Sequence, residues 1–307
     1  MKTVVYQSFR TENVPGWISA CMASVRSWAT YQGFDYRFWD DSFFDLVPPH
    51  LRPRASVHKC LLSDYARLVA ARHLLASGYD RAIWVDADAT VFDPQRFMID
   101  LTSGYAFCRE VWHDLTLLGR PLFKLTVNNS VSVFCRDEDI IDTYLEAAES
   151  ILLSDQPLAA VSIGTEWLHT RRQKHNFPLL THVGILGPEM MYRYLHDDGN
   201  FLRPYLRYQT SPVYAVNLCN SKLGSVYRFP GSTEPWVLDN ATLCRLIAKL
   251  QDDKGESLNR HFDRAYSRAE REFSQPLSRL QDWIRRLQVY VAHRFSIHLG
   301  KSPACMP

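Results

Sequence analysis

Hydrophobic residues recur along the first 135 residues in two alternating rhythms, and together these rhythms predict an α/β domain. Short apolar runs are typical of strands, whereas apolar residues at every third or fourth position are typical of helices. Strands are expected at 2–6, 34–39, 81–85, 105–108 and 130–134. Helices are expected from Trp17 to a stop near Gly33, over 56–77, and over 137–153.

The pattern loosens in the second half of the chain. Prolines recur between 176 and 236 and favour loops and edge strands over another regular layer. They stand at 178, 188, 204, 212, 230 and 235. From about residue 238 the chain is expected to be helical and strongly charged. We therefore predict one domain over 1–237 and a helical C-terminal extension over 238–307.

Composition narrows the class of protein. A chain of 307 residues with 46% hydrophobic and 22% charged residues has enough apolar surface to fold, which excludes disorder. The formal net charge of +2 gives no reason to expect a nucleic-acid partner. Seven scattered cysteines without a CxxC pair argue against a disulfide framework or a zinc site. No apolar run approaches the roughly 18 residues of a membrane span or forms the core of a signal peptide. We expect a cytoplasmic protein.

Two carboxylates follow the most apolar of the predicted strands. The run 81–85 ends in Asp86, and Asp88 comes two residues later. Ligands of open α/β sheets bind at the carboxyl ends of the strands. Two carboxylates at such an edge form a site of hard oxygen ligands that suits Mg²⁺ or Mn²⁺. A divalent cation there would neutralise the charge on a departing nucleotide diphosphate.

A second polar pair precedes this strand. The segment SDYAR (63–67) places Asp64 and Arg67 three residues apart on one face of the predicted helix. Taken alone, the pair is explained by a structural ion pair, and a bare DxD by turn-capping aspartates. Both motifs at this separation are harder to obtain by accident, which favours a functional site.

The order of these motifs resembles the metal-dependent glycosyltransferases of the GT-A fold. SDYAR, about twenty further residues, and a strand ending in DAD look most like glycosyltransferase family 32, with features shared with family 8 and the clostridial glucosylating toxins. The resemblance covers about residues 1–135 and is faint from there to 190. The segments VVYQSF (4–9), SVRSW (24–28), YRFWDD (36–41), the Asn-Asn-Ser step at 128–130 and THVGILGPEM (181–190) add to it.

The resemblance implies a fold and a reaction. The fold would be a single Rossmann-like GT-A domain with a mostly parallel sheet and a helical C-terminal appendage. The reaction would move a sugar from a UDP- or GDP-linked donor to a hydroxyl of a glycan, a lipid-linked acceptor or a protein. It would use Mn²⁺ or Mg²⁺ and retain the anomeric configuration.

The resemblance also implies roles for individual residues. Asp88 would bind the metal directly, and Asp86 would contact both the metal and the ribose of the donor. Asp64 and Arg67 would hold the donor sugar and its diphosphate. The remaining donor-binding residues would be Tyr6, Gln7 and Phe9 at the base and ribose, Asn129 at the sugar, and Ala87 between the two aspartates.

The sequence departs from the family at its C-terminal metal ligand. The family often supplies a histidine from a segment ending in Ser-Trp, but the comparable stretch 225–236 contains no histidine. Four residues remain open as substitutes, namely Asn217, Asn220, Glu234 and His182.

Two other functions compete for the same motif. The string VDADATVF also matches the nucleophile loop of haloacid-dehalogenase-type phosphatases, with Asp86 as nucleophile and Asp88 as general acid. That loop normally follows the first strand, and its second acidic pair would have to be Asp197 and Asp198, which follow a helix-like segment. The other alternative is a non-catalytic relative that binds sugar nucleotides.

The segment 277–301 combines an apolar helical stripe with many arginines. Covering the protein's own core, lying on an anionic membrane surface and binding a partner protein all fit this pattern. A peripheral membrane contact on the inner face of the membrane is the functional expectation.

Overall fold

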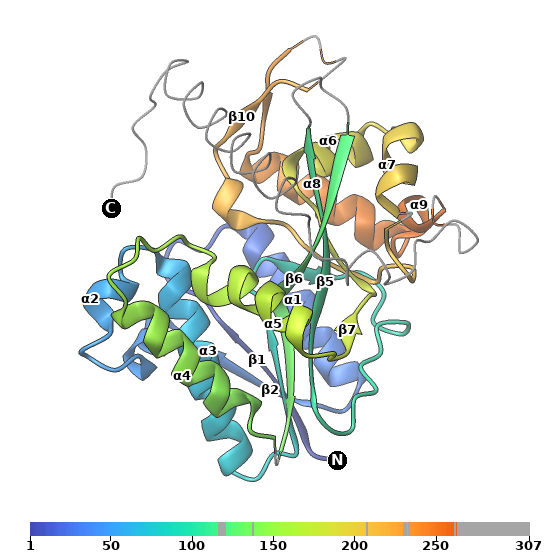
Figure 1. Ribbon diagram of the computed structural model, residues 1–307. Coiled ribbons are helices and arrows are strands. Elements are labelled where there is room, and N and C mark those ends of the chain that lie inside the picture. Colours follow the sequence, from blue (N-terminus) through green and yellow to red (C-terminus); the bar gives the residue numbers. More distant parts are fainter. Residues whose placement is uncertain are drawn as a thin grey trace.

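The computed structural model describes residues 1–115, 121–136, 138–206, 208–229, 232, 234–260 and 262. Its centre is a six-stranded sheet, which Figure 1 shows with helices on both sides. The strands of this sheet are β1 (Thr3–Ser8), β2 (Asp35–Trp39), β3 (Arg81–Val85), β5 (Tyr105–Leu115), β6 (Pro121–Cys135) and β7 (Leu179–Leu180).

The strand pairings make this sheet mostly parallel. The spatial order is β2-β1-β3-β6-β5-β7. Strand β1 is parallel to β2 and β3, and β5 is parallel to β7. Strand β6 is antiparallel to both β3 and β5, so it alone runs against the other strands of this sheet. The predicted α/β class with a mostly parallel sheet is therefore confirmed.

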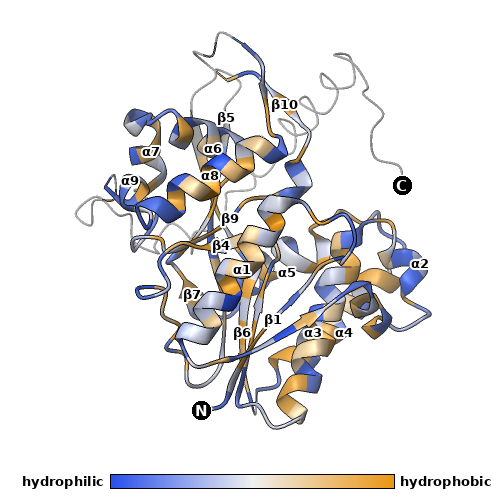
Figure 2. Ribbon diagram, turned by 180° about the vertical axis from the view of Figure 1, so that it is seen from behind, coloured by the Kyte–Doolittle hydropathy of each residue, from blue (hydrophilic) through white to orange (hydrophobic). Residues whose placement is uncertain are grey.

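Helices cover both faces of the sheet because its central strands are apolar on both sides. Val4 and Tyr6 of β1 pack in one core cluster with α3 (Lys59–Ala76) and α4 (Ile140–Leu153). Val5, which points to the opposite face, packs with Val25 and Trp28 of α1 (Gly16–Tyr31). Figure 2, which views the molecule from behind, shows α1 in front of the sheet, and hydrophilic colours on peripheral elements such as α2 (Arg52–Ala55). This burial on both faces is what parallel strands require.

A second, three-stranded sheet adjoins the first. It consists of β4 (Ala89–Val91), β9 (Ala215–Asn217) and β8 (Val183–Ile185), in the order β4-β9-β8. Strand β4 follows β3 after only three residues, Asp86 to Asp88. The acidic turn therefore lies where the chain passes from the large sheet to the small one.

The proline-rich region is more regular than its sequence predicts. Besides short strands it contains two helices, α6 (Pro188–Leu195) and α7 (Gly199–Leu206). Pro188 occupies the first turn of α6, where a missing N–H removes no helical hydrogen bond. The helix-like segment that precedes Asp197 is therefore confirmed as α6, whereas α7 was not expected from the sequence. The other short elements of the structure are the 3₁₀ segments η1 (Asp41–Leu46) and η3 (Asn220–Lys222), the π-helical turn η2 (Ser162–Glu166), the helix α5 (Trp167–Lys174), and the hairpin of β10 (Val226–Tyr227) and β11 (Trp236–Val237).

The described part of the C-terminal region is helical and packs on the domain. Helix α8 (Asn240–Asp252) buries Leu246 and Leu250 in the same core cluster as Trp17 of α1, and α9 (Glu256–Asn259) follows. The Trp17 indole also donates to Asn240 Oδ1 at 2.9 Å. A boundary at 237 stays a prediction, and the segment 277–301 lies outside the described residues. Within the part of the chain that is described, no helix is long and apolar enough to cross a membrane.

Candidate active site

The turn Asp86–Asp88 presents its two carboxylates at the edge where β3 ends and β4 begins. Both side chains are partly exposed, whereas Ala87 between them is buried. The turn is anchored to β6, because the Asp86 N–H donates to the Ser130 carbonyl at 2.7 Å. The carboxyl end of a central parallel strand thus carries the two acids, as expected from the sequence.

Arg67 holds one of these acids from the α3 side. Its Nη2 lies 3.3 Å from Asp86 Oδ1 and 3.1 Å from Asp64 Oδ1. Its Nη1 donates to the Asn129 carbonyl at 2.8 Å, and the guanidinium stacks over the Trp84 ring. The Arg67 side chain is only 6% exposed. The structure therefore brings Asp64, Arg67 and Asp86 together, with Arg67 beneath the surface that a ligand would meet.

Asn129 reaches this cluster through an irregularity in β6. Phe107 of β5 pairs with Ser132, whereas the next residue of β5 pairs with Asn128. Asn129 and the two residues after it therefore bulge out of the ladder between β5 and β6, and such bulges re-aim side chains beside active sites. The Asn129 Nδ2 donates to Asp64 Oδ1 at 2.9 Å. The sequence indicated Asn129 only by family resemblance, because nothing local in it predicts the register shift.

The small sheet supplies the other side of the site. Asn217, the last residue of β9, donates from Nδ2 to Asp88 Oδ1 at 2.7 Å and to Asp86 Oδ2 at 3.4 Å. Cys219 has a φ of 50°, and the left-handed turn there aims the Asn220 N–H at Asp88 Oδ2, 2.7 Å away. Two of the four open candidates for a further ligand, Asn217 and Asn220, thus lie beside the acids.

The other two candidates lie elsewhere. The His182 carbonyl accepts from the Tyr214 N–H at 2.9 Å, and its ring packs against Phe97. His182 therefore precedes β8, at the opposite end of the small sheet from Asn217. Burial lowers the pKa of His182 to about 4. Glu234 is exposed, in the segment between β10 and β11.

The acids share a site that is short of positive charge. Burial is the main cause that raises the pKa of Asp64, Asp86 and Asp88 above its usual value. The Arg67 guanidinium opposes these shifts, while the neighbouring Asp88 raises the pKa of Asp86 further, to about 7. Three carboxyls against one guanidinium leave a net negative charge when all are ionised. A cation is the species that this arrangement would bind.

The donor set fits a magnesium or manganese ion that also binds ligand oxygens. Carboxylate oxygens from Asp86 and Asp88 are the hard ligands these ions prefer, and Mg²⁺ usually keeps only one or two protein carboxylates besides waters and substrate phosphates. Asn217 already bridges both acids with its amide. Within the described ranges, no group of three or more His, Cys, Asp or Glu side chains could enclose a metal.

Two side chains of the first strand, β1, hydrogen-bond to the backbone of the site. Tyr6 and Gln7 are both 0% exposed, because β1 is covered on both faces. The Tyr6 hydroxyl donates to the Arg67 carbonyl at 2.8 Å, and Gln7 Nε2 donates to the Asp86 carbonyl at 3.2 Å. The expectation that these two side chains line a nucleotide is thus corrected: they position α3 and the acidic turn. Phe9, just beyond the strand, is partly exposed.

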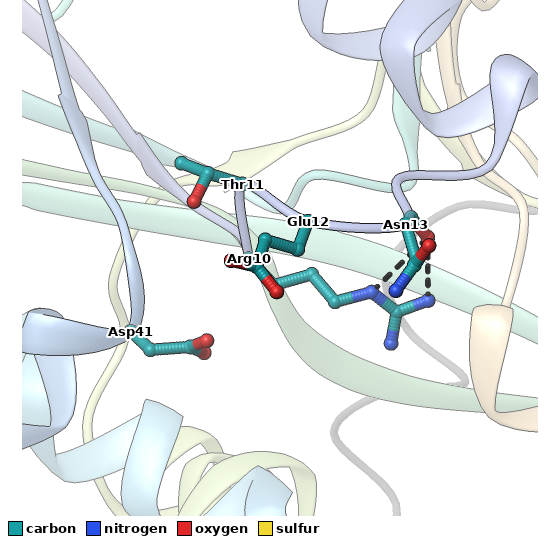
Figure 3. Close-up of a pocket in the computed structure, with 5 residues that line it drawn as sticks. All are labelled: Arg10, Thr11, Glu12, Asn13 and Asp41. Carbon is teal, nitrogen blue, oxygen red and sulfur yellow. Dashed lines mark hydrogen bonds between the residues drawn. The ribbon is translucent and has the colours of Figure 1, made fainter.

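A polar hollow opens next to Phe9. Its volume is about 570 Å³, and Figure 3 shows Arg10 extended across it towards Asn13, with Asp41 entering from the segment after β2. Thr11 and Glu12 complete the lining. Because β1 and β2 run parallel to β3, the residues that follow these strands lie at the same edge of the sheet as the acidic turn. Nothing in the sequence predicts this hollow beyond the expected ends of the two strands.

The acids required by the phosphatase alternative lie in the helical part of the chain. Asp197 forms ion pairs with Lys249 of α8, at 2.8 Å, and with Arg260, at 3.3 Å. Asp198 pairs with Arg193 of α6 at 3.2 Å. These contacts hold both acids with α6 and α8, whereas Asp86 is held by α3, β1 and β9.

Comparisons with known proteins return structures but no family. No protein-family model matches the chain, and no curated protein sequence matches it. It is similar to a glycosyltransferase involved in the glycosylation of the major capsid of PBCV-1, with a TM-score of 0.40 and 12% identity over 71% of this chain and 93% of that one. It is also similar to the apo-form glycosyltransferase GlyE of Streptococcus pneumoniae TIGR4, with a TM-score of 0.41 and 11% identity over 87% of this chain and 65% of that one. Because the identities and TM-scores of both matches are low, the function is argued from the residues of the site.

Proposed function

We propose that this protein is a metal-dependent glycosyltransferase that moves a sugar from a UDP- or GDP-linked donor to an acceptor hydroxyl. One observation carries the proposal. Asp86 and Asp88 lie at the open edge of a mostly parallel sheet, and Arg67 pairs with Asp86, while the groups that bond to Asp88 among the described residues are neutral. Such an edge is where α/β proteins bind nucleotides, and such a charge deficit suits a divalent cation with a diphosphate.

The positions of the surrounding groups support a donor that spans the sheet edge. The hollow is lined by residues that follow β1 and β2, and the acidic turn follows β3, which neighbours β1. Neighbouring strands are about 4.8 Å apart, so a nucleoside in the hollow would place its diphosphate at the acids. We assign the hollow to the nucleoside, Asp86 and Asp88 to the metal and diphosphate, and Asp64 with Asn129 to the sugar.

The reaction exchanges one bond at the anomeric carbon. The bond to the diphosphate oxygen breaks, a bond to the acceptor oxygen forms, and the proton of the acceptor hydroxyl passes to the departing phosphate. Mn²⁺ or Mg²⁺, when bound by Asp86 and Asp88, would offset the charge that collects on the leaving diphosphate. Arg67 acts as a positioning residue, because its guanidinium holds Asp64 and Asp86. Retention of configuration, and with it a front-face displacement, is proposed from the family resemblance alone.

A panel of UDP- and GDP-sugars incubated with Mn²⁺ tests the proposal. We expect at least one donor to release its nucleotide, and EDTA to stop the release. A protein that binds donors without turning any over would be the non-catalytic relative. Hydrolysis of phosphomonoesters through an aspartyl-phosphate on Asp86 would show that the phosphatase alternative is correct.

We also propose a cytoplasmic enzyme that touches the inner face of the membrane through 277–301, and an acceptor that is a glycan, a lipid-linked glycan or a protein. Support comes from the sequence, where Arg285 and Arg286 stand beside an apolar stripe. Each basic residue near an anionic bilayer contributes about 1 kcal/mol. The whole chain should co-sediment with anionic liposomes, and Arg285→Glu/Arg286→Glu should release it. Equal binding to neutral liposomes would remove the electrostatic part of the proposal.

A further inference from the structure

A buried glutamate that the proposed reaction does not use lies in the long ladder between β5 and β6. Glu110 is 7% exposed and stands opposite Thr126. The Thr126 hydroxyl donates to its Oε2, and Asn128 Nδ2 donates to its Oε1 at 3.2 Å. No ion pair between Glu110 and a Lys, Arg or His is found among the described residues, and burial raises the pKa of this acid. Burying a carboxylate without a counter-charge lowers stability, so its position needs another explanation.

Asn128 links this acid to the irregular part of β6. Its Nδ2 donates to Glu110, whereas its Oδ1 accepts from the Ser130 N–H at 2.7 Å. Ser130 belongs to the bulge before Ser132, where β6 leaves its ladder with β5. The Asn128 side chain therefore supplies a hydrogen bond to a backbone N–H of the bulge, whose residues are unpaired with β5.

The acid determines which way the Asn128 amide points. An amide that is turned over exchanges its donor and acceptor ends. An ionised carboxylate only accepts hydrogen bonds, so Glu110 keeps Nδ2 on its own side and leaves Oδ1 for the Ser130 N–H. The opposite orientation would place an oxygen against the carboxylate and a donor against the N–H. Glu110 therefore selects the orientation in which the bulge is hydrogen-bonded.

The bulge in turn anchors the acidic turn of the proposed site. The Ser130 carbonyl accepts from the Asp86 N–H at 2.7 Å. The residue before it, Asn129, is the one whose side chain reaches the acid of α3. Hydrogen bonds therefore lead from Glu110 to Asp86 through one side chain, that of Asn128, and one residue of the bulge.

We propose that Glu110 is a positioning residue, which orients Asn128 and through it holds the β6 bulge and the turn Asp86–Asp88 in the form that binds a metal. The inference rests on the proposed function and deepens it, because it adds to Arg67 and Asn217 a third group that fixes the acids. Loss of Glu110 should therefore weaken metal binding in folded protein, although neither of its hydrogen bonds is to an acid of the turn.

The experiment compares Glu110→Ala with Glu110→Gln and with Glu189→Ala. In Glu110→Gln the side-chain oxygen still accepts from Asn128 and the amide donates to the Thr126 hydroxyl, so the link is kept. Glu189 is the matched control, because it has the same 7% exposure but is held by Arg193 within α6. For each variant, electron paramagnetic resonance gives the dissociation constant of Mn²⁺ in the presence of UDP or GDP. Urea unfolding gives the free energy of unfolding.

We expect Glu110→Ala to raise the dissociation constant of Mn²⁺ by about 10- to 100-fold, as loss of a group that orients metal ligands does. Glu110→Gln should remain close to the wild type. Glu189→Ala should lower stability and leave the constant unchanged, which separates positioning from stability. An unchanged constant in Glu110→Ala, or a loss in either of the other variants equal to that in Glu110→Ala, would overturn the inference. A wild type that binds no Mn²⁺ with either diphosphate would instead contradict the proposed function.

A further pair of variants tests the route through Asn128 and covers the case in which Glu110→Ala does not fold. Asn128→Ala keeps the bond from Thr126 to Glu110 and removes the bond to Ser130. It should raise the Mn²⁺ constant by at least as much as Glu110→Ala. Because Glu110 acts through Asn128, the double variant Glu110→Ala/Asn128→Ala should bind Mn²⁺ as Asn128→Ala does. A further loss in the double variant, or an unchanged constant in Asn128→Ala, would overturn the inference.

Discussion

Asp86 and Asp88 are held by two unlike regions of the molecule. On the α3 side, the buried guanidinium of Arg67 pairs with Asp86. On the side of the small sheet, the bonds to Asp88 come from neutral groups, the amide of Asn217 and the N–H of Asn220. Among the described residues, no Lys, Arg or His forms an ion pair with Asp88.

The two sides of the turn therefore have different roles, one in stability and one in binding. A guanidinium beside a buried acid balances the negative charge of that acid within the protein. Amide donors, in contrast, orient an acid without cancelling its charge. The α3 side therefore stabilises the fold, and the small-sheet side leaves the charge of Asp88 for a cation. Removing groups from the two sides should have different consequences.

The largest effect is expected from Asp88→Ala. Among the described residues Asp88 forms no ion pair, so its charge remains for a cation, and nucleotide release that depends on Mn²⁺ should fall by at least about 100-fold without it. The melting temperature should change little, since Asp88 is partly exposed. Asp142→Ala, which removes an exposed acid paired with Arg72, is the control and should leave the rate unchanged. Full activity in Asp88→Ala would rule out its role.

Arg67→Ala should instead act mainly on stability. The change leaves Asp64 and Asp86 without their guanidinium, and breaking a buried ion pair costs about 3–5 kcal/mol of the free energy of unfolding. Arg72→Ala is the matched control on the same helix, because the Arg72–Asp142 pair is more than half exposed. It should cost about 0–1 kcal/mol. Urea unfolding measures the free energy of unfolding of both variants. An equal loss of this free energy in the two would contradict the difference between buried and exposed pairs.

Asn217→Ala removes the neutral bridge between the two acids. It should weaken Mn²⁺ affinity by about 10- to 100-fold, as loss of a group that orients metal ligands does. Its effect on unfolding should be smaller than that of Arg67→Ala, because no buried charge loses its counter-charge. Calorimetric Mn²⁺ titration in the presence of UDP or GDP measures the first quantity. Unchanged affinity would show that the small sheet does not orient the acids.

The pH dependence should be the smallest effect. Burial and the neighbouring Asp88 raise the pKa of Asp86 from an ordinary 3.8 to about 7. Folded protein without metal therefore holds a proton there that the unfolded chain releases, so this acid lowers stability as pH rises from 3.8 to 7. A bound metal displaces the proton and offsets the loss. The increase in melting temperature caused by Mn²⁺ should be larger at pH 7.5 than at pH 5.5, and a larger increase at pH 5.5 would contradict the sign.

The same two regions differ in how far the sequence predicts them. Asp64 and Arg67 share a helix face, and Asp86 ends an apolar strand, so short-range patterns identify the three. Asn217 reaches Asp88 only because β4 pairs with β9, more than 120 residues along the chain. No local pattern marks that pairing. Tyr6 and Gln7 were expected to line a nucleotide, but both side chains are buried. A motif match does not reveal that a central strand is covered on both faces.

The central claim is that the turn Asp86–Asp88 binds a divalent cation together with a nucleoside diphosphate. Electron paramagnetic resonance measures free Mn²⁺ directly as protein is added, with and without UDP or GDP. We predict one Mn²⁺ bound per chain, more tightly when the diphosphate is present, and binding at least about tenfold weaker in Asp88→Asn, which removes the charge while keeping the size. Mn²⁺ binding that is the same in the wild type and Asp88→Asn, or that does not respond to either diphosphate, would contradict the claim.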